Sequence, residues 1–431
     1  MTLTELYAIY KEHPIICTDT RKITQGCLFF ALKGPNYNAN KFADEALNKG
    51  ASFCIIDDAE YATNAKFILV DDALLALQQL ANHHRKQLNI PVIAIVGSNG
   101  KTTTKELITA VLSTTFIVWA TPGNFNNHIG LPLTLLQLTH QHQVAIIEMG
   151  ANHVGENADL CAIAEPTLGI VTNNGMDHLE GFGDIEGVAK SNSELYYYLL
   201  KNSGTAFVNA HDEWLMRMSS RLKKCKTYAA NTNLRNVTAD YIGFANQLQP
   251  SISYKYEELL GTSVLSGDYN FDNIMAAIAI AKYLGVNNQN IVKGIESYQP
   301  TNNRSQWIKK EHNVIFMDAY NANPSSMEVA LRNFAAMDHP HKIVIMGDMF
   351  EMGNYAKAEH QRMVDLCEGL KLNNVILVGE EFVNLNPNNK LAFKTTQQAS
   401  EFIKQQFYKN CAFFIKGSRG MKLETLSDVI E

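Results

Sequence analysis

The 431-residue sequence has no stretch of about 20 consecutive apolar residues, so no segment has the composition of a membrane-spanning helix. Its first residues include Glu5, Lys11 and Glu12 and no long apolar core, which predicts that the chain carries no export signal. Basic runs are also absent, and 37 basic side chains are balanced by 43 acidic ones. These absences predict a cytoplasmic protein with neither a membrane nor a nucleic-acid partner.

The seven cysteines are scattered, and no two have Cys-x-x-Cys spacing. An odd, scattered set argues against a disulfide framework and against a zinc knuckle, and is typical of a protein from a reducing compartment. Internal repeats and low-complexity segments are missing as well. The length allows about three domains, each large enough to bury its own core.

Residues 92–106 combine an apolar strand, a glycine loop and a helix. The β-branched apolar run at 92–96 is typical of a strand buried on both faces. The glycines that follow allow backbone N–H groups to turn inward around an anion at a helix N-terminus. The pattern predicts a nucleotide site in which Lys101 reaches the phosphates and Thr102 holds Mg²⁺. The predicted loop consists of Gly97, Ser98, Asn99, Gly100, Lys101, Thr102 and Thr103.

One glycine of the full phosphate-loop pattern is missing, because Ile95 stands six residues before the lysine. A plain strand-to-helix turn is therefore an alternative. The apolar strand, the two glycines and the following helix together favour the nucleotide site.

Strand-like and helix-like segments alternate along the chain, which predicts an α/β fold of three domains. We expect a small α/β N-terminal domain at 1–83, a central P-loop parallel-sheet ATPase domain at 84–300 and a C-terminal Rossmann-like α/β domain at 301–431. The expected strands lie at 27–32, 52–56, 67–70, 92–96, 116–120, 144–149, 168–172, 205–208, 314–317, 342–346, 374–378 and 412–416. Residues 237–256 partly alternate and predict an antiparallel ribbon appended to the central domain.

Polar residues end the central strands, at the edge where ligands of parallel sheets bind. Glu148 directly follows a buried strand, where a carboxylate is costly to desolvate unless it is paired or bound to metal. It is a candidate Mg²⁺ ligand, with a solvated turn glutamate as the alternative. His178 ends another strand, and an inert structural histidine is an equally good interpretation of it. Asn270 and Asn273 lie near the start of an alanine-rich helix, where capping explains at least one of them.

Four further polar segments lie next to strands, one in the N-terminal domain and three in the C-terminal domain. Thr20 and Arg21 lie before the first N-terminal strand, where a surface turn is the simpler interpretation and a phosphate or sugar rim the functional one. In the third domain, residues 318–324, 347–353 and 416–420 end three strands and predict a second ligand-binding rim that faces the nucleotide.

Taken together, these stretches resemble the Mur ligases over nearly the whole chain. Residues 19–21 together with residues 28–34 resemble the family's UDP-binding N-terminal domain, and residues 97–103 its ATP loop. Glu148-Met-Gly and His178-Leu-Glu-Gly-Phe-Gly are similar to its two magnesium-site segments. The most discriminating piece is Tyr320-Asn-Ala-Asn-Pro324, which is similar to the branch that adds D-alanyl-D-alanine and unlike the Asp-Asn-Pro-Arg signature of the branch that adds the preceding diamino acid.

The resemblance implies an ATP-dependent amide ligase with Mg²⁺, whose substrates are UDP-N-acetylmuramoyl-tripeptide and D-alanyl-D-alanine, and we expect a monomer. It implies that Lys101, Glu148 and His178 are catalytic, and that Thr102, Glu148 and His178 serve the metals. Asn270, Asn273 and Arg304 would contact the nucleotide. The UDP-sugar peptide would face Thr20, Arg21, Asn124, Asn126 and Asn127, and the dipeptide would lie nearest Asn321, Asn323, Lys416, Ser418 and Arg419.

Two positions depart from the family pattern. Tyr269 replaces a histidine before the adenine helix, which affects only that contact. Asn192 stands two residues before Glu194, where the family has a lysine that CO₂ carbamylates to support the metal site. Lys190 lies roughly 200° around the helix from Asn192 and should point elsewhere. We therefore hypothesise that this chain manages its second metal without a carbamate.

Three other functions remain open at this stage. A folate-type or other sister ligase would share the ATP loop but lack the UDP segment and residues 320–324. A non-catalytic protein that binds ATP and UDP-sugar is motivated by Asn192 and Ile95. A simple kinase would gain little from a third domain with its own polar strand ends.

Overall fold

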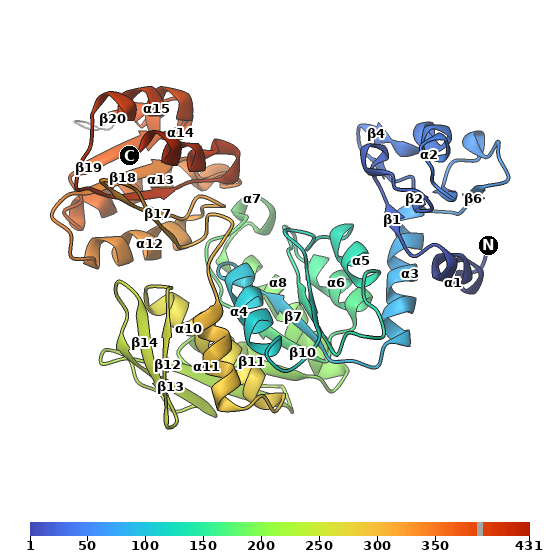
Figure 1. Cartoon of the computed structure of the whole chain (residues 1–431), viewed down its shortest axis with the longest axis horizontal. Helices are drawn as coiled ribbons and strands as arrows, with labels where there is room; N and C mark the ends of the chain where they lie inside the picture. Colours follow the sequence, from blue (N-terminus) through green and yellow to red (C-terminus); the bar gives the residue numbers. More distant parts are fainter. Residues whose placement is uncertain (386–390) are drawn as a thin grey trace.

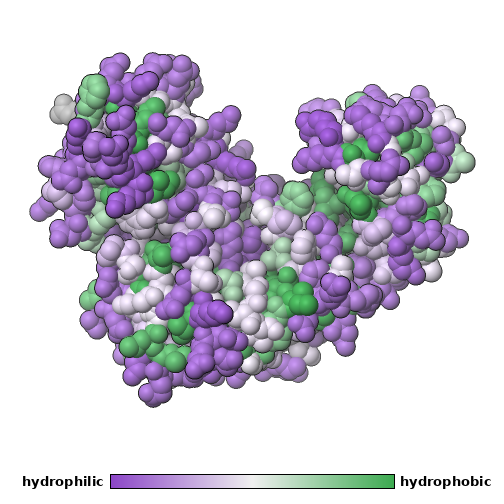
Figure 2. All heavy atoms as spheres, viewed as in Figure 1, coloured by the Kyte–Doolittle hydropathy of each residue, from purple (hydrophilic) through white to green (hydrophobic). Residues whose placement is uncertain are grey.

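The computed structural model describes residues 1–385 and 391–431, which form three α/β regions, each around its own main sheet (Figure 1). The α/β class and the three-domain arrangement predicted from the sequence are confirmed. The N-terminal and C-terminal regions both stand on the central one, and Figure 2 shows a hollow between them. Within the described residues, no helix combines the length and apolar character needed to cross a membrane.

The N-terminal region has a parallel sheet of order β1-β2-β5-β6 and a separate antiparallel pair, β3 and β4. Helix α3 packs on α5 and α6 of the central region, and its apolar face shares one core with them. The expected boundary after residue 83 therefore falls inside one continuous helix. The elements are α1 (Leu3–Glu12), β1 (Ile16–Cys17), β2 (Leu28–Phe30), β3 (Lys33–Gly34), β4 (Tyr37–Asn38), α2 (Ala43–Asn48), β5 (Phe53–Ile56), β6 (Phe67–Leu69) and α3 (Ala73–Gln87).

The central region is built on a nine-stranded sheet of order β15-β14-β13-β12-β11-β10-β7-β9-β8. Its first part contains β7 (Val92–Val96), α4 (Lys101–Leu112), β8 (Val118–Ala120), α5 (Gly130–Leu135), β9 (Val144–Glu148), α6 (Glu156–Ala164), β10 (Leu168–Val171), α7 (Leu179–Phe182), α8 (Ile185–Lys201) and β11 (Thr205–Asn209). Its second part contains α9 (Glu213–Ser219), β12 (Cys225–Asn231), β13 (Tyr241–Gln247), β14 (Ile252–Tyr256), β15 (Leu259–Ser263), α10 (Asp268–Tyr283) and α11 (Asn288–Ser297).

Strand β7 shows why the middle of this sheet is apolar throughout. Ile93 and Ile95 pack with α4, α10 and α11, whereas the alternate residues Val92, Ala94 and Val96 pack with α5, α6 and α8. Successive side chains of a strand point to opposite faces, so helices on both faces require apolar residues at every position. All five residues of β7 are buried, as are all five of β9.

The predicted ribbon is antiparallel, but it is not a separate appendage. Strands β13, β14 and β15 form antiparallel pairs, and β13 also pairs in parallel with β12, which continues the central sheet from β11. The sequence analysis missed β12 and β15. Strand β12 ends in Ala-Ala-Asn, which lacks the alternating apolar pattern of an exposed strand and the bulky run of a central one.

The C-terminal sheet has the order β16-β17-β21-β18-β19-β20, and among the strands of the described residues only the pair β16–β17 is antiparallel in this sheet. Apolar cores cover both of its faces. The elements are β16 (Gln306–Lys309), β17 (Val314–Met317), α12 (Pro324–Ala336), β18 (Lys342–Gly347), α13 (Ala356–Gly369), β19 (Asn374–Val378), α14 (Glu380–Asn384), β20 (Leu391–Phe393), α15 (Thr396–Gln405) and β21 (Ala412–Lys416).

Candidate active site

The loop between β7 and α4 has the geometry of an anion site. Gly97 and Gly100 have φ of 129° and 79°, in the left-handed region that favours glycine. Gly100 is the N-cap of α4, and no side chain in the described part of the chain caps that helix. The first N–H groups of α4 have no intrahelical partner, so they remain available to an anion. Lys101 Nζ lies across the loop and donates to the carbonyl oxygens of Gly97 and Ser98.

Residues after β10 hold this loop from the other side. Ser98 Oγ donates to Gly175 O at 3.2 Å and accepts from Gly175 N at 2.9 Å. Asn99 N donates to Asn173 Oδ1 at 3.1 Å, and Thr172 Oγ1 donates to Asn99 O at 2.6 Å. A side chain at Gly97 would collide with Thr172, since an added Cβ would lie 2.2 Å from its Oγ1. The loop is therefore fixed in shape by the protein itself.

Glu148 ends β9 and is 2% exposed, so the solvated-glutamate alternative is wrong. Its position in the sheet is opposite Ile95, beside the phosphate loop. Asn126 Nδ2 donates to Glu148 Oε1 at 3.0 Å, while Oε2 has no hydrogen-bond partner among the described residues. The nearest cation to Oε2 is Lys105 Nζ at 3.6 Å, which donates instead to Thr121 O at 2.9 Å.

A buried carboxylate oxygen without a hydrogen bond is costly unless a cation uses it. The Glu148 oxygen beside the phosphate loop therefore fits Mg²⁺, which takes one or two carboxylates together with phosphate oxygens and water. No cluster of three or more His, Cys, Asp and Glu side chains that could hold a metal ion by itself occurs in residues 1–385 and 391–431.

His178 stands at the start of α7 with φ of 46° and contacts carboxylates from two domains. Its Nδ1 pairs with Glu351 of the C-terminal domain, and its Nε2 lies 3.5 Å from Asp177 Oδ1. In this arrangement His178 joins the strand-end loop after β10 to the C-terminal domain.

The N-terminus of α12 also docks on the phosphate loop. Asn323 caps this helix and donates from Nδ2 to Asn99 Oδ1 at 2.9 Å and to Asp177 Oδ1 at 3.3 Å. Beside it, Ser325 Oγ accepts from Met176 N at 2.7 Å. Asn323 thus lies against the loop that the sequence assigns to ATP, in addition to its predicted place near the dipeptide.

The remaining residues predicted on the C-terminal rim gather around the ends of β17 and β21. Lys416 is 3% exposed, and its Nζ pairs with Asp318 Oδ2 at 2.5 Å and donates to Asn321 O at 3.1 Å. Ser418 Oγ accepts from Phe350 N at 2.9 Å. Arg419 Nη1 donates to Tyr320 Oη at 3.0 Å.

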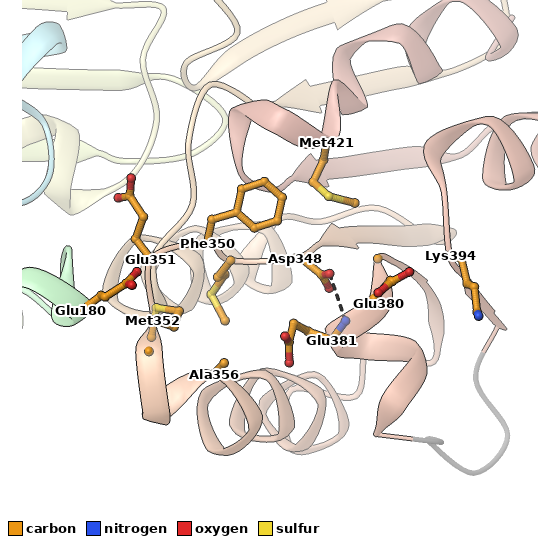
Figure 3. A pocket seen from close by; sticks show the side chains of 13 residues that line it. Glu180, Asp348, Phe350, Glu351, Met352, Ala356, Glu380, Glu381, Lys394 and Met421 are labelled. Carbon is orange, nitrogen blue, oxygen red and sulfur yellow. Dashed lines mark hydrogen bonds between the residues drawn. The ribbon is translucent and has the colours of Figure 1, made fainter. Parts of the chain in front are cut away.

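A cavity of about 440 Å³ lies beside this rim, and Glu180 of α7 contributes to its wall. In Figure 3, Glu180 and Glu351 lie on one side of it, Lys394 lies on the other, and Phe350 and Met421 stand between them. Asp348 forms part of its wall and accepts from the N–H groups at the start of α14, at 3.0 and 3.2 Å. Burial raises the pKa of Asp348 above its usual range.

Asn270 and Asn273 lie inside α10, and neither caps it. Asn270 is 1% exposed and donates to Ser266 O at 2.9 Å. Asn273 accepts from Thr104 Oγ1 at 3.0 Å and lies so close to Gly100 that an added Cβ there would be 2.8 Å from Asn273 Oδ1. Asn273 therefore joins α10 to the phosphate loop and α4.

The residues predicted to face the UDP-sugar peptide each contact different partners in the structure. Arg21 pairs with Asp19 at 2.8 Å, and its side chain is largely exposed, as the surface-turn interpretation expects. Thr20 begins the same short helical turn, and Asn124 is exposed in the loop after β8. Asn127 Oδ1 accepts from Gly130 N at 2.9 Å at the start of α5, and Asn126 serves Glu148.

Asn192 lies buried in α8, and Lys190 is exposed. Asn192 Nδ2 donates to Asn174 Oδ1 at 2.8 Å, in the loop that holds the phosphate segment. Glu194 accepts from the N–H groups of Gly155 and Ala158 at 2.7 and 2.9 Å, at the start of α6, and burial raises its pKa. The buried face of α8 thus presents an amide, not a lysine, to the strand-end loops.

Sequence reasoning missed Lys105 as part of this site, and it gave Asn173 and Tyr320 no role of their own beyond their places in polar strand-end segments. Lys105 stands one turn after Lys101 on the buried side of α4, and a charged residue at a buried helical position is the signal that marks it. Asn173 and Tyr320 lie in the loops after strands β10 and β17, and only the folded geometry shows which partners they meet.

Two family models match the chain: the Mur ligase middle domain over residues 95–281, and the Mur ligase, glutamate ligase domain over residues 303–415. The UDP-N-acetylmuramoyl-tripeptide--D-alanyl-D-alanine ligase of Bacillus subtilis is 32% identical over 432 residues, which cover 96% of this chain and 93% of that protein. The chain belongs to the Mur ligase family. It is therefore a ligase, and the resemblance drawn from its motifs is confirmed.

Two further relatives agree with this assignment. The Escherichia coli protein of the same name is 34% identical over 374 residues, 85% of this Mur ligase and 81% of that protein. A crystal structure of MurF from Acinetobacter baumannii has a TM-score of 0.88 at 30% identity and covers 99% of this chain and 98% of that one. The similarity therefore extends over all three domains.

Proposed function

We propose that this Mur ligase joins D-alanyl-D-alanine to UDP-N-acetylmuramoyl-tripeptide at the expense of ATP, in the synthesis of peptidoglycan precursors. The observation that carries the proposal is the buried Glu148 carboxylate, whose Oε2 accepts no hydrogen bond from the described residues, beside an uncapped helix N-terminus and Lys101. The names of the similar proteins and the Tyr320–Pro324 segment support the choice of substrates over those of a folate-type or other sister ligase.

A carboxylate needs activation before an amine can displace its oxygen. The tripeptide carboxylate attacks the γ-phosphorus of ATP, ADP leaves, and an acyl phosphate forms. The N–H groups at the start of α4 and the ammonium of Lys101 stabilise the charge on the transferring phosphoryl group. Thr102, Glu148 and His178 would hold Mg²⁺, which supplies further charge neutralisation at the phosphates.

The amine of the dipeptide then attacks the acyl carbon. A tetrahedral intermediate forms, phosphate leaves with the former carboxylate oxygen, and the amide bond is complete. No protein nucleophile takes part. The cavity in Figure 3 suits the dipeptide, because Glu180 and Glu351 attract an ammonium group and Phe350 and Met421 offer apolar contacts to methyl groups.

The other predicted residues keep their assignments as part of this proposal. Asn270, Asn273 and Arg304 contact the nucleotide, and residues 20–21 and 124–127 face the UDP-sugar peptide across the hollow seen in Figure 2. The dipeptide lies near Asn321, Asn323, Lys416, Ser418 and Arg419. The domain limits 1–83, 84–300 and 301–431, a monomeric state and a cytoplasmic location belong to the proposal as well.

The direct test measures phosphate release with ATP, Mg²⁺, D-alanyl-D-alanine and UDP-N-acetylmuramoyl-tripeptide in its lysine and diaminopimelate forms. Mass spectrometry of the product should show one pentapeptide for each phosphate with at least one of the two acceptors. Phosphate release without the dipeptide, or with glutamate in its place, would contradict the proposal.

A non-catalytic nucleotide-binding role is the second candidate, and Asn192 in place of the family's lysine is the observation that favours it. Such a protein would bind ATP and the UDP-sugar peptide yet release neither phosphate nor pentapeptide. Calorimetry of both ligands beside the product assay separates the two candidates.

A further inference from the structure

The segment that carries His178 is docked on the C-terminal domain. Leu179 of α7 is buried and packs in the apolar core of that domain with Met352. Glu180 N donates to Glu351 O at 3.2 Å, and in Figure 3 these two residues lie next to each other on the cavity wall. The position of His178 therefore depends on a domain other than its own.

The side chains of His178 and Glu351 meet across the boundary between the two domains. The Nδ1 atom of His178 is buried, and its contact within the described residues is with Glu351 Oε2. An ionised carboxylate can only accept a proton donor, so it favours the tautomer of His178 that carries the proton on Nδ1. That tautomer leaves the lone pair of Nε2 for a cation.

Both residues of this pair have a left-handed backbone. The φ angle is 46° at His178 and 61° at Glu351, a conformation that residues other than glycine rarely adopt. Residues held in this region are frequent at functional sites, because the surrounding structure must offset the strain. Two such residues in contact, one from each domain, hold the imidazole ring in one direction.

The opposite ring nitrogen lies close to a second carboxylate. His178 Nε2 is 3.5 Å from Asp177 Oδ1, which accepts from Asn323 Nδ2 at 3.3 Å. Asn323 Nδ2 also donates to Asn99 Oδ1, so a chain of polar contacts connects His178 Nε2 to the phosphate loop. With the proton on Nδ1, a nitrogen lone pair and a carboxylate oxygen face each other, and they repel unless a cation lies beside both.

We propose that Glu351 of the C-terminal domain is a positioning residue for the metal site, whose carboxylate fixes the tautomer and the direction of the His178 ring so that Nε2 binds the metal while the two domains are docked. Histidines that bind a metal in general donate their other ring N–H to a carboxylate or carbonyl group. The inference rests on the proposed function only for His178 as a metal ligand.

Mn²⁺ is the probe, because the carboxylate, carbonyl and water ligands of Mg²⁺ also suit Mn²⁺ and because Mn²⁺ is paramagnetic. Electron paramagnetic resonance with saturating AMP-PNP gives the dissociation constant of Mn²⁺ without turnover, and its pulsed form detects coupling of bound Mn²⁺ to an imidazole nitrogen. The wild type should show this coupling, and His178→Ala should not.

Glu351→Ala should weaken the binding of the nitrogen-coupled Mn²⁺ by about tenfold. Glu351→Gln should have a smaller effect, because its amide oxygen still accepts from Nδ1, and it also serves as the test if Glu351→Ala does not fold. In a His178→Ala background, Glu351→Ala should cause no further loss, since Glu351 acts through His178. Glu381→Ala is the matched control, because it removes an acid from the wall of the same cavity and should change Mn²⁺ binding by less than about twofold.

Mn²⁺ binding that is unchanged in Glu351→Ala, or equally weakened in Glu381→Ala, would overturn the proposal, as would a wild type without nitrogen coupling. The radius of gyration of Glu351→Ala should equal that of the wild type, because Leu179 and Asn323 still hold the domains together; a larger radius would assign Glu351 to docking and overturn its positioning role. If the wild type shows the coupling but forms no pentapeptide, the proposed ligase fails and the role of Glu351 at the metal site stands.

Discussion

At the scale of one residue, the assignment of Glu148 depends on its buried Oε2, which accepts no hydrogen bond from the described residues. This oxygen is the reason to regard Glu148 as a metal ligand and not as a structural carboxylate. Glu148→Gln keeps the size of the side chain and its contact with Asn126, but removes the negative charge. We expect kcat to fall by about 100-fold or more, since charge stabilisation through a metal is worth several kcal/mol in the transition state. The melting temperature should fall as well, because the buried Lys105 Nζ, 3.6 Å from Oε2, loses its nearest negative charge.

Phosphate release and thermal melting check this prediction. Glu186→Gln, at an exposed position in the first turn of α8, is the matched control and should keep wild-type activity. A Glu148→Gln variant as active as the wild type would contradict a metal role for Glu148.

Asn192 gives a second prediction at this scale. Its amide donates to Asn174 in the strand-end loop, so we expect the site to be compensated without a carbamate. Asn192→Lys should therefore show no bicarbonate-dependent gain in rate, and wild-type activity should not depend on bicarbonate. Rates measured with and without added bicarbonate in degassed buffer decide the matter. A variant that became much faster only with bicarbonate would show that the wild-type site has lost a function.

At the scale of elements, α10 joins the central sheet to the phosphate loop and carries a partly buried acid, Asp272. Burial raises the pKa of Asp272 to about 6, and its ion pair with Arg235 at 2.9 Å only partly opposes this. The folded state therefore binds the proton more tightly than the unfolded chain, whose aspartate titrates near 4. By linkage, the contribution of Asp272 to stability is fully present below about pH 4 and is lost as the pH rises through about 6.

Asp272→Asn should remove this dependence. We expect the melting temperature of the wild type, relative to that of Asp272→Asn, to fall between pH 4 and pH 6 and to stay level above pH 7. Melting curves of both proteins across this range provide the measurement. Parallel pH profiles would contradict a raised pKa at Asp272.

At the scale of the whole molecule, the contact of Asn323 with Asn99 and Asp177 ties the C-terminal domain to the phosphate loop. We expect the domain to close further about residues 298–303 when AMP-PNP and the UDP-sugar peptide bind. Asn323→Asp retains an N-cap for α12 but places a carboxylate against Asp177, so the variant should close less while α12 stays folded.

Small-angle scattering checks this closure through the radius of gyration. The wild type should become more compact with both ligands, and Asn323→Asp should become less so. Asn354→Asp adds the same charge at an exposed position of the same domain and should behave as the wild type. No compaction of the wild type with both ligands would contradict the closure.

Local patterns predicted the parts of this molecule that depend on neighbours in sequence. The strand, the loop and the start of the helix at 92–106 were predictable because periodicity and glycine placement are local signals, and the burial of Glu148 follows from its place at the end of an apolar strand. Strand β12 was missed, because its pairing with β11 and β13, not its own pattern, makes it a strand.

Contacts between domains could not be predicted in the same way. Asn99 and Asn323 are more than 200 positions apart, and Arg304, Tyr320 and Arg419 meet only because β17 and β21 are neighbours in the sheet. Side-chain packing between folded domains selects these partners, and residue types alone leave many partners open.

The measurement that tests the central claim most directly follows oxygen from substrate to product. The tripeptide carboxylate of UDP-N-acetylmuramoyl-tripeptide is labelled with ¹⁸O, and the enzyme turns over with ATP, Mg²⁺ and D-alanyl-D-alanine. The acyl-phosphate route predicts a pentapeptide product and one ¹⁸O atom in each phosphate released. Unlabelled phosphate, or labelled phosphate without pentapeptide, would contradict the ligase mechanism.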